Sequence, residues 1–167
     1  QTPFIARGSG TGLAGGAVPV GNPVIISTAK MNKILDIDLE DRIAWVEPGV
    51  LNLDLSKALK EFGFHFAPDP SSQQVCSIGG NVANNSGGPH CLAYGVTTSH
   101  VLAAEVVLPN AELVTLGGID PEPTGYDLRG LFIGSEGTMG IATKIAVRLT
   151  PNPPDVRTLL LDFADVS

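Results

Sequence analysis

Short apolar runs, each bounded by glycine, proline or a polar turn, predict a series of short strands along the chain. In the first third these runs are residues 4–6, 24–26, 34–38 and 43–47. The run at 24–26 is β-branched and predicts a buried strand. Leu39–Arg42 separates the last two runs and predicts a hairpin, which Pro48 and Gly49 end.

Two segments have the signature of a helix. In the first, Leu55, Ala58, Leu59 and Phe62 form one apolar stripe between Asn52, the expected N-cap, and a glycine at position 63. The second runs from Ser77 as cap to Asn85, although it contains two adjacent glycines. Prolines between residues 65 and 72 exclude a helix interior there.

The second half of the chain repeats the mixture of hairpins and loops. Its predicted elements are a hairpin of 101–109 with 112–116, a loop at 121–126, strands at 131–134 and 141–149, a boundary at 151–154 and a new element from 158 to 163. Hairpins together with helices favour the α+β class. We expect one domain over residues 1–150, followed by a linker and the start of another domain over 151–167.

Composition narrows the function. The 167 residues include 17 acidic and 10 basic side chains, a net charge of −7, which argues against binding to nucleic acid or to an anionic membrane surface. No apolar run is long enough to span a membrane. The two cysteines, Cys76 and Cys91, are too few for a disulfide framework and suggest reduced thiols and a cytoplasmic location.

Glycine is abundant, with 20 residues, and is concentrated in three segments. No Lys or Arg lies between Lys60 and Arg129, where the central segment is found. An anion bound there would be met by backbone N–H groups. The first segment, residues 7–16, matches the dinucleotide-binding pattern GxGxxG from Gly10 onward. Pro19 and Pro23 follow where the helix of such a site should begin, and this excludes a Rossmann site. Whether this segment is a ligand loop or only a surface loop stays open.

The central segment, residues 77–88, gives a stronger indication. Gly79 and Gly80 each cost a helix about 1 kcal/mol relative to alanine, so we expect them to allow close approach of a flat or phosphorylated ligand. In the third segment, residues 134–140, Glu136 is either a turn residue or an acceptor for hydrogen-bond donors of a ligand. His90 follows the central segment and is a candidate to face a ligand.

Four motifs in this order resemble one protein family. They are Arg7-Gly-Ser-Gly-Thr-Gly12, Pro68-Asp-Pro-Ser-Ser72, Ser77 to Gly88, and Gly134-Ser-Glu-Gly-Thr-Met-Gly-Ile141. Together they are similar to the PCMH-type FAD-binding domain of the vanillyl-alcohol-oxidase flavoproteins. Within that family the likeness is greatest to the branch containing the FAD subunit of bacterial glycolate oxidase and D-lactate dehydrogenases, through residues 68–72 and 85–92.

The resemblance implies two α+β lobes with FAD held between them. It implies that the pyrophosphate contacts Arg7, Gly8, Ser9, Gly10, Thr11 and Gly12. The pyrophosphate, ribityl chain and ring would contact Gly79, Gly80, Asn81, Asn84, Asn85, Ser86, Gly87 and Gly88. Pro68 and Asp69 would lie near the ring, and Glu136, Gly140 and Ile141 at the adenosine half. Relatives with covalent flavin carry a histidine in the first loop. This chain has none there, so the FAD is expected to be non-covalent.

The implied activity is oxidation of a small 2-hydroxy acid such as glycolate or D-lactate, with hydride passing to flavin N5. Electrons would leave to an iron–sulfur partner subunit, either in the cytoplasm or peripherally at the inner membrane. An N-terminal lobe segment and a cap domain, with histidines for a divalent metal and for catalysis, are expected outside this chain, so no catalytic base is nominated. The alternatives are another enzyme of the same fold, such as alkyl-glycerone-phosphate synthase, and a non-catalytic flavin-binding module.

Overall fold

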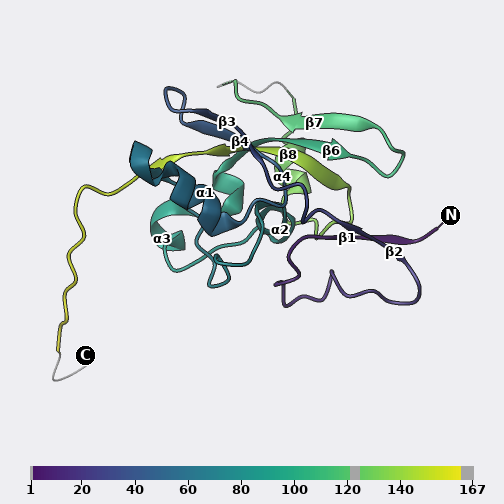
Figure 1. The fold of residues 1–167 in the computed structure, drawn as a ribbon, viewed down its shortest axis with the longest axis horizontal. Coiled ribbons are helices and arrows are strands. Elements are labelled where there is room, and N and C mark those ends of the chain that lie inside the picture. Colours follow the sequence, from purple (N-terminus) through teal and green to yellow (C-terminus); the bar gives the residue numbers. More distant parts are fainter. Residues whose placement is uncertain (1, 121–124, 163–167) are drawn as a thin grey trace.

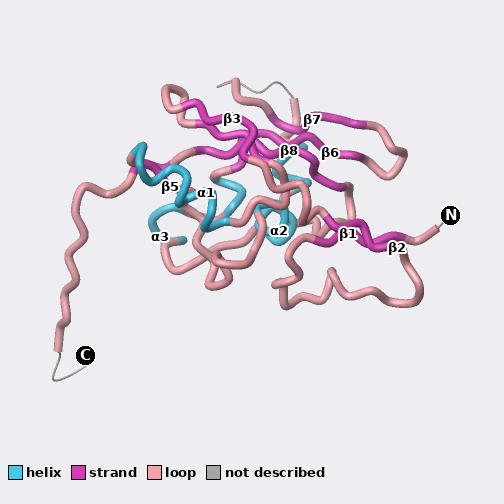
Figure 2. The backbone as a smooth tube through the Cα atoms, in the orientation of Figure 1, coloured by secondary structure: helices cyan, strands magenta, loops and turns pink. Residues whose placement is uncertain are grey.

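The computed structural model of the chain describes residues 2–120 and 125–162. A small parallel sheet lies beside a larger antiparallel sheet, and helices α1, α2 and α3 lie on one side of the larger sheet (Figure 1). Loops join most of these elements and account for much of the backbone near the small sheet (Figure 2). This mixture confirms the expected α+β class.

The small sheet consists of β1 (Phe4–Arg7) and β2 (Val24–Ser27), which pair in parallel with Phe4 opposite Val24. Residues 8–23 connect the two strands without a helix or strand of their own. The prediction that residues 24–26 are buried is wrong for the described chain: Val24, Ile25 and Ile26 are 53%, 43% and 40% exposed. β2 pairs only with β1, and no described element covers its side chains.

The larger sheet has the order β3-β4-β8-β6-β7, with every neighbouring pair antiparallel. Its strands are β3 (Ile34–Asp38), β4 (Ile43–Val46), β6 (Val101–Val107), β7 (Leu113–Gly117) and β8 (Ile141–Arg148). Both predicted hairpins are confirmed, as β3–β4 and β6–β7. Outside this sheet, β5 (Phe64–His65) pairs with β9 (Thr150–Pro151), and residues 152–162 then continue without a helix or strand.

Helix α1 (Asn52–Leu59) continues into a 3-10 turn, η1 (Lys60–Phe62), and ends at a left-handed glycine as expected. The predicted N-cap is wrong, because Leu51 occupies that position. The Asn52 side chain is instead buried and donates hydrogen bonds to the Pro68 carbonyl oxygen at 2.8 Å and to Asn81 Oδ1 at 3.2 Å. Phe62, expected on the packed stripe, is 44% exposed.

Helix α2 (Ile78–Asn84) begins at Ser77, whose Oγ accepts the Gly80 N–H at 3.3 Å, so this predicted cap is confirmed. The short helix α3 (Cys91–Tyr94) and the 3-10 turn η2 (Thr97–Ser99) were not predicted.

The strand predicted at Leu131–Gly134 is wrong, because residues Leu128–Phe132 form helix α4. The Asp127 carboxylate starts this helix by accepting the Gly130 N–H at 2.9 Å, a capping bond that overrides the β-like apolar run. Residues 121–124 of the predicted loop lie outside the described residues, and 158–162 contain no helix or strand.

The core lies between the larger sheet and the helices. Ile145 and Val147 of β8 and Val106 of β6 pack in one cluster with Leu55 of α1 and Val82 of α2, all nearly inaccessible to solvent. This packing fixes α2 against the larger sheet, and α2 lies between that sheet and the small sheet's side of the molecule (Figure 1). Within the described ranges, no helix combines the length and apolar character needed to cross a bilayer.

Candidate functional site

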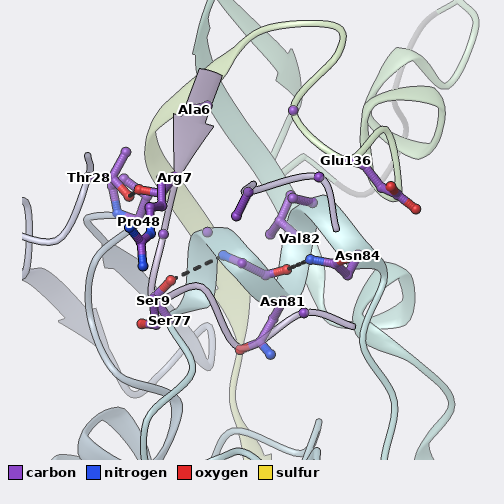
Figure 3. Close-up of a pocket in the computed structure, with 18 of the residues that line it drawn as sticks. Ala6, Arg7, Ser9, Thr28, Pro48, Ser77, Asn81, Val82, Asn84 and Glu136 are labelled. Atoms are coloured by element: carbon purple, nitrogen blue, oxygen red, sulfur yellow. Dashed lines mark hydrogen bonds between the residues drawn. The ribbon is translucent and has the colours of Figure 1, made fainter. Parts of the chain in front are cut away.

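The three glycine-rich segments converge on one pocket of about 380 Å³ between the small sheet and α2 (Figure 3). That volume lies in the range typical of small-molecule and cofactor sites. Fourteen of the residues expected to contact a cofactor line it: Arg7, Gly8, Ser9, Gly10, Thr11, Gly12, Gly79, Gly80, Asn81, Asn84, Ser86, Glu136, Gly140 and Ile141. Segments separated by more than a hundred residues in the chain thus meet at one site.

Five of the expected residues do not line the pocket: Pro68, Asp69, Asn85, Gly87 and Gly88. Asn85 has its side chain engaged elsewhere, because Oδ1 accepts hydrogen bonds from the Thr98 N–H at 2.9 Å and from Thr98 Oγ1 at 2.8 Å. Gly88 packs directly against Asp69: a Cβ at position 88 would overlap the backbone carbonyl of Asp69. Asn85 and Gly88 therefore make contacts within the protein, outside the lining of the pocket.

Residues 8–16, which we call the glycine strap, form one pocket wall. None of their backbone N–H groups donates a hydrogen bond to another described residue. The left-handed backbone at Gly10 and Gly15 lets the strap turn along the pocket (φ 74° and 85°). A run of unpaired amides on a concave surface is the arrangement that proteins use to bind anionic oxygen atoms.

The strap lies directly on the first turn of α2. A Cβ at Gly8 would lie 2.7 Å from Ser77 Oγ, so only glycine allows this approach without a shift of the capping serine. At the other end of the helix, Asn84 Nδ2 donates to the Gly80 carbonyl oxygen at 2.9 Å (Figure 3). Both side chains thus fix the helix backbone that forms the opposite wall.

The two glycines of α2 have different reasons to be glycine. A Cβ at Gly79 would lie 2.7 Å from Pro48 Cβ and 2.9 Å from its carbonyl oxygen, so this position is required by packing within the protein. A Cβ at Gly80 would meet only Ser77 Oγ, at 3.3 Å, and otherwise points into open space. Gly80 therefore fits the expected close approach of a ligand, whereas the explanation offered for Gly79 was wrong.

The pocket has few charged side chains: among the described residues that line it, Arg7 and Glu136 alone are charged at neutral pH. Glu136 adopts left-handed backbone, with φ 54°, and its N–H donates to the Ala83 carbonyl oxygen at 2.8 Å. The Glu136 carboxylate has no ion-pair partner among the described residues. An acceptor and a cation are thus left available to a ligand at opposite parts of the pocket.

Sequence reasoning missed several lining residues, namely Thr28, Pro48, Phe132, Ser135 and Ala142. No local pattern identifies them, because they reach the pocket only through the tertiary fold. Ser135 Oγ is buried and has no hydrogen-bond partner in the described chain. Within the described residues, no group of three or more His, Cys, Asp or Glu side chains is arranged to hold a metal ion.

His100 is buried, with its ring edge-on to that of Phe66, and burial lowers its pKa below the ordinary value of 6.5. Its Nε2 donates to the Tyr94 carbonyl oxygen at 2.8 Å, which partly opposes the shift, while the charges of Arg148 and His65 add to it. Nδ1 is buried and has no hydrogen-bond partner among the described residues, as expected for a neutral imidazole.

We expect acid to destabilise the protein through His100. Because its pKa is lower in the folded state, the unfolded chain binds more protons below pH 6.5, and the free energy of unfolding should fall as the pH drops through that value. Urea denaturation between pH 5 and 8 measures this slope. His100→Gln, which cannot titrate, should flatten it; an unchanged slope would assign the effect to other groups.

Comparison with known proteins identifies the family. A sequence profile described as "FAD binding domain" matches residues 1–117, well over half of the chain. The chain belongs to the FAD-binding domain family. The family expected from the four motifs is thereby confirmed.

Relatives of this FAD-binding domain include proteins named as a glycolate oxidase subunit and as a D-lactate dehydrogenase. It is 48% identical to "Glycolate oxidase subunit GlcD" of Escherichia coli (strain K12) over 166 residues, covering 99% of the chain and 33% of the relative. It is 44% identical to the subunit of the same name from Bacillus subtilis (strain 168), covering 99% and 36%. For "D-lactate dehydrogenase" of Anaerostipes hadrus the identity is 41%, covering 99% and 35%. The chain thus spans about a third of the length of these relatives.

A solved structure titled "alkyldihydroxyacetonephosphate synthase in P1" has the same fold, with a TM-score of 0.78 at 27% identity, covering 92% of this chain and 30% of that one. The expected fold is therefore confirmed for the FAD-binding domain.

Proposed function

We propose that the pocket binds FAD non-covalently, with the glycine strap around the pyrophosphate. The observation that carries this proposal is the run of unpaired strap amides facing α2 across a pocket of cofactor size. Arg7 supplies positive charge beside them, so the pyrophosphate is met mainly by backbone N–H groups. Thr11 and its neighbours offer no histidine for a covalent bond to the flavin.

The remaining walls fit the other parts of the cofactor. Glu136, Gly140 and Ile141 would hold the adenosine half, with the carboxylate accepting hydrogen bonds from ribose hydroxyls or the adenine amine. Ser135 Oγ, unpaired in the described chain, is a further polar group for that half. The flavin ring would extend past Ser86, toward the contact between Asp69 and Gly88.

We propose that the whole protein oxidises a small 2-hydroxy acid, glycolate or D-lactate, to the 2-oxo acid. Support comes from the names of relatives that match nearly the whole chain at more than 40% identity. When bound, the flavin would supply the redox chemistry by accepting a hydride at N5. The described residues would hold the cofactor, exclude water from its pyrophosphate and set the position of its ring.

The organisation of the full protein is also a proposal. Residues 1–150 would form most of the FAD-binding domain, and 151–167 would lead into a substrate cap. Support comes from the end of the domain, where the Asn152 N–H donates to the Gly63 carbonyl oxygen and residues 153–162 are exposed. We further propose a divalent metal in the cap, an iron–sulfur partner as electron acceptor, and a location in the cytoplasm or at the inner membrane surface.

Anaerobic reduction of the flavin tests this function. The FAD-loaded full-length protein, mixed with D-lactate or glycolate and no NAD, should lose the visible absorbance of its oxidised flavin. L-lactate serves as the matched control, because it differs only in the configuration of the carbon that gives up hydride. Bleaching by neither acid would leave flavin binding intact and remove the 2-hydroxy-acid assignment in favour of another reaction of the same fold.

A further inference from the structure

Two polar side chains from separate segments meet behind the pocket wall. Asp69 Oδ2 lies 2.5 Å from His90 Nδ1, and we call this pair the Asp69–His90 latch. The Asp69 side chain is only 21% exposed, whereas that of His90 is 68% exposed. Because a carboxylate accepts, Nδ1–H donates, which fixes the tautomer and orientation of the ring.

The latch is the only hydrogen bond that joins residues 64–72 to residues 84–100 in the described part of the chain. The two segments are otherwise held by close packing, since Gly88 lies directly against the backbone carbonyl of Asp69. The Gly88 N–H donates to Cys91 Sγ at 3.0 Å, so the residue in contact with Asp69 is also tied to helix α3, which begins directly after His90.

The segment behind the wall is itself well fixed. Ser86, which lines the pocket, accepts hydrogen bonds at its carbonyl oxygen from the Thr97 N–H at 3.0 Å and from Thr97 Oγ1 at 2.7 Å. The Tyr94 ring packs edge-on to His65, with centroids 5.9 Å apart, and against His90 at 6.4 Å. A displacement of His90 would therefore be transmitted to residues 86–88 rather than absorbed by a flexible loop.

We propose that His90 is a positioning residue for the flavin: by binding Asp69 it holds residues 68–69 against Gly88, next to Ser86, at the end of the pocket toward which the flavin ring would extend. This inference rests on the proposed function. A contribution to the stability of the fold does not explain the pair, because an ion pair with an exposed partner adds little to the free energy of unfolding. Its consequence is local, because loss of the imidazole leaves the largely buried Asp69 carboxylate without a side-chain partner beside Gly88.

The test compares His90→Ala, His90→Arg and Lys57→Ala in the full-length protein. His90→Ala should weaken FAD binding about fivefold and shift the visible spectrum of the bound flavin, because the contact between Asp69 and Gly88 next to Ser86 relaxes. His90→Arg should restore the affinity to within about twofold, since a guanidinium also donates to a carboxylate. Lys57→Ala removes an exposed ion pair with Asp54, distant in sequence from the latch, and should change neither quantity.

The readouts separate positioning from simple stability. Fluorescence titration gives the affinity for FAD, the visible spectrum reports the ring environment, and thermal unfolding of the apoprotein reports the fold. Unchanged affinity and spectrum in His90→Ala would overturn the inference, as would a lower unfolding temperature with an unchanged spectrum. If the wild-type protein itself took up no FAD, the proposed function would fail and this inference with it; failure of the inference alone would show as normal FAD binding in every variant.

Discussion

Gly80→Val should weaken FAD binding about a hundredfold while the apoprotein remains folded. The side chain at position 80 would meet only Ser77 Oγ within the protein and otherwise project into the pocket, between α2 and the glycine strap. Valine also costs a helix no more than glycine does, so the fold loses little. The cofactor would have to give up close contact with the helix backbone.

Gly79→Val is the matched control for this experiment, because it places the same side chain one residue away. There the new side chain would collide with Pro48, at 2.7 Å from the first added atom, so stability should fall more than FAD binding. Fluorescence titration of FAD and urea denaturation of the apoprotein measure the two effects. If both variants lost affinity and stability to the same extent, the pocket would not lie where Gly80 faces.

Gly49→Ala should destabilise the protein by about 3 kcal/mol. A Cβ at position 49 would overlap the carbonyl oxygen of Thr28 and lie 2.6 Å from that of Met31. The Gly49 N–H also donates to the Met31 carbonyl oxygen at 2.7 Å, so the residue cannot move away without losing this bond. These contacts attach the end of β2 to the turn before α1.

Urea denaturation of the full-length apoprotein measures the effect, with Gly118→Ala as control. A Cβ at Gly118 would meet only the Asp120 backbone nitrogen, at 3.9 Å, so that variant should unfold like the wild type. Because Pro48 lines the pocket next to Gly49, we also expect FAD affinity to fall in Gly49→Ala. Wild-type stability in this variant would mean that the small sheet is attached elsewhere.

Local sequence patterns predicted the elements that are held together by residues close to one another in the chain. The hairpins β3–β4 and β6–β7 follow from strand runs separated by short polar turns, and the Ser77 cap follows from a serine before a helical stretch. The same reasoning failed at Asn52, because its side chain forms hydrogen bonds with residues 16 and 29 positions away in the chain. No cap pattern can reveal such distant partners.

The site was predicted from glycine density and from family motifs, but its geometry was not. Density identified the strap and α2, and the motifs added Glu136, Gly140 and Ile141, which do line the pocket. Neither signal could separate Gly79 from Gly80, since the difference depends on Pro48 from another segment. For the same reason Asn85 was expected to face the cofactor, although its side chain caps the η2 turn through Thr98.

Uptake of FAD by the full-length apoprotein tests the central claim most directly. We expect purified protein to show flavin absorbance, to lose it as free FAD on denaturation, and to regain it when the apoprotein is mixed with FAD. Release of intact FAD by acid or urea confirms that the bond is non-covalent. A protein without flavin bands that takes up no added FAD would contradict the assignment of the amide-lined pocket to this cofactor.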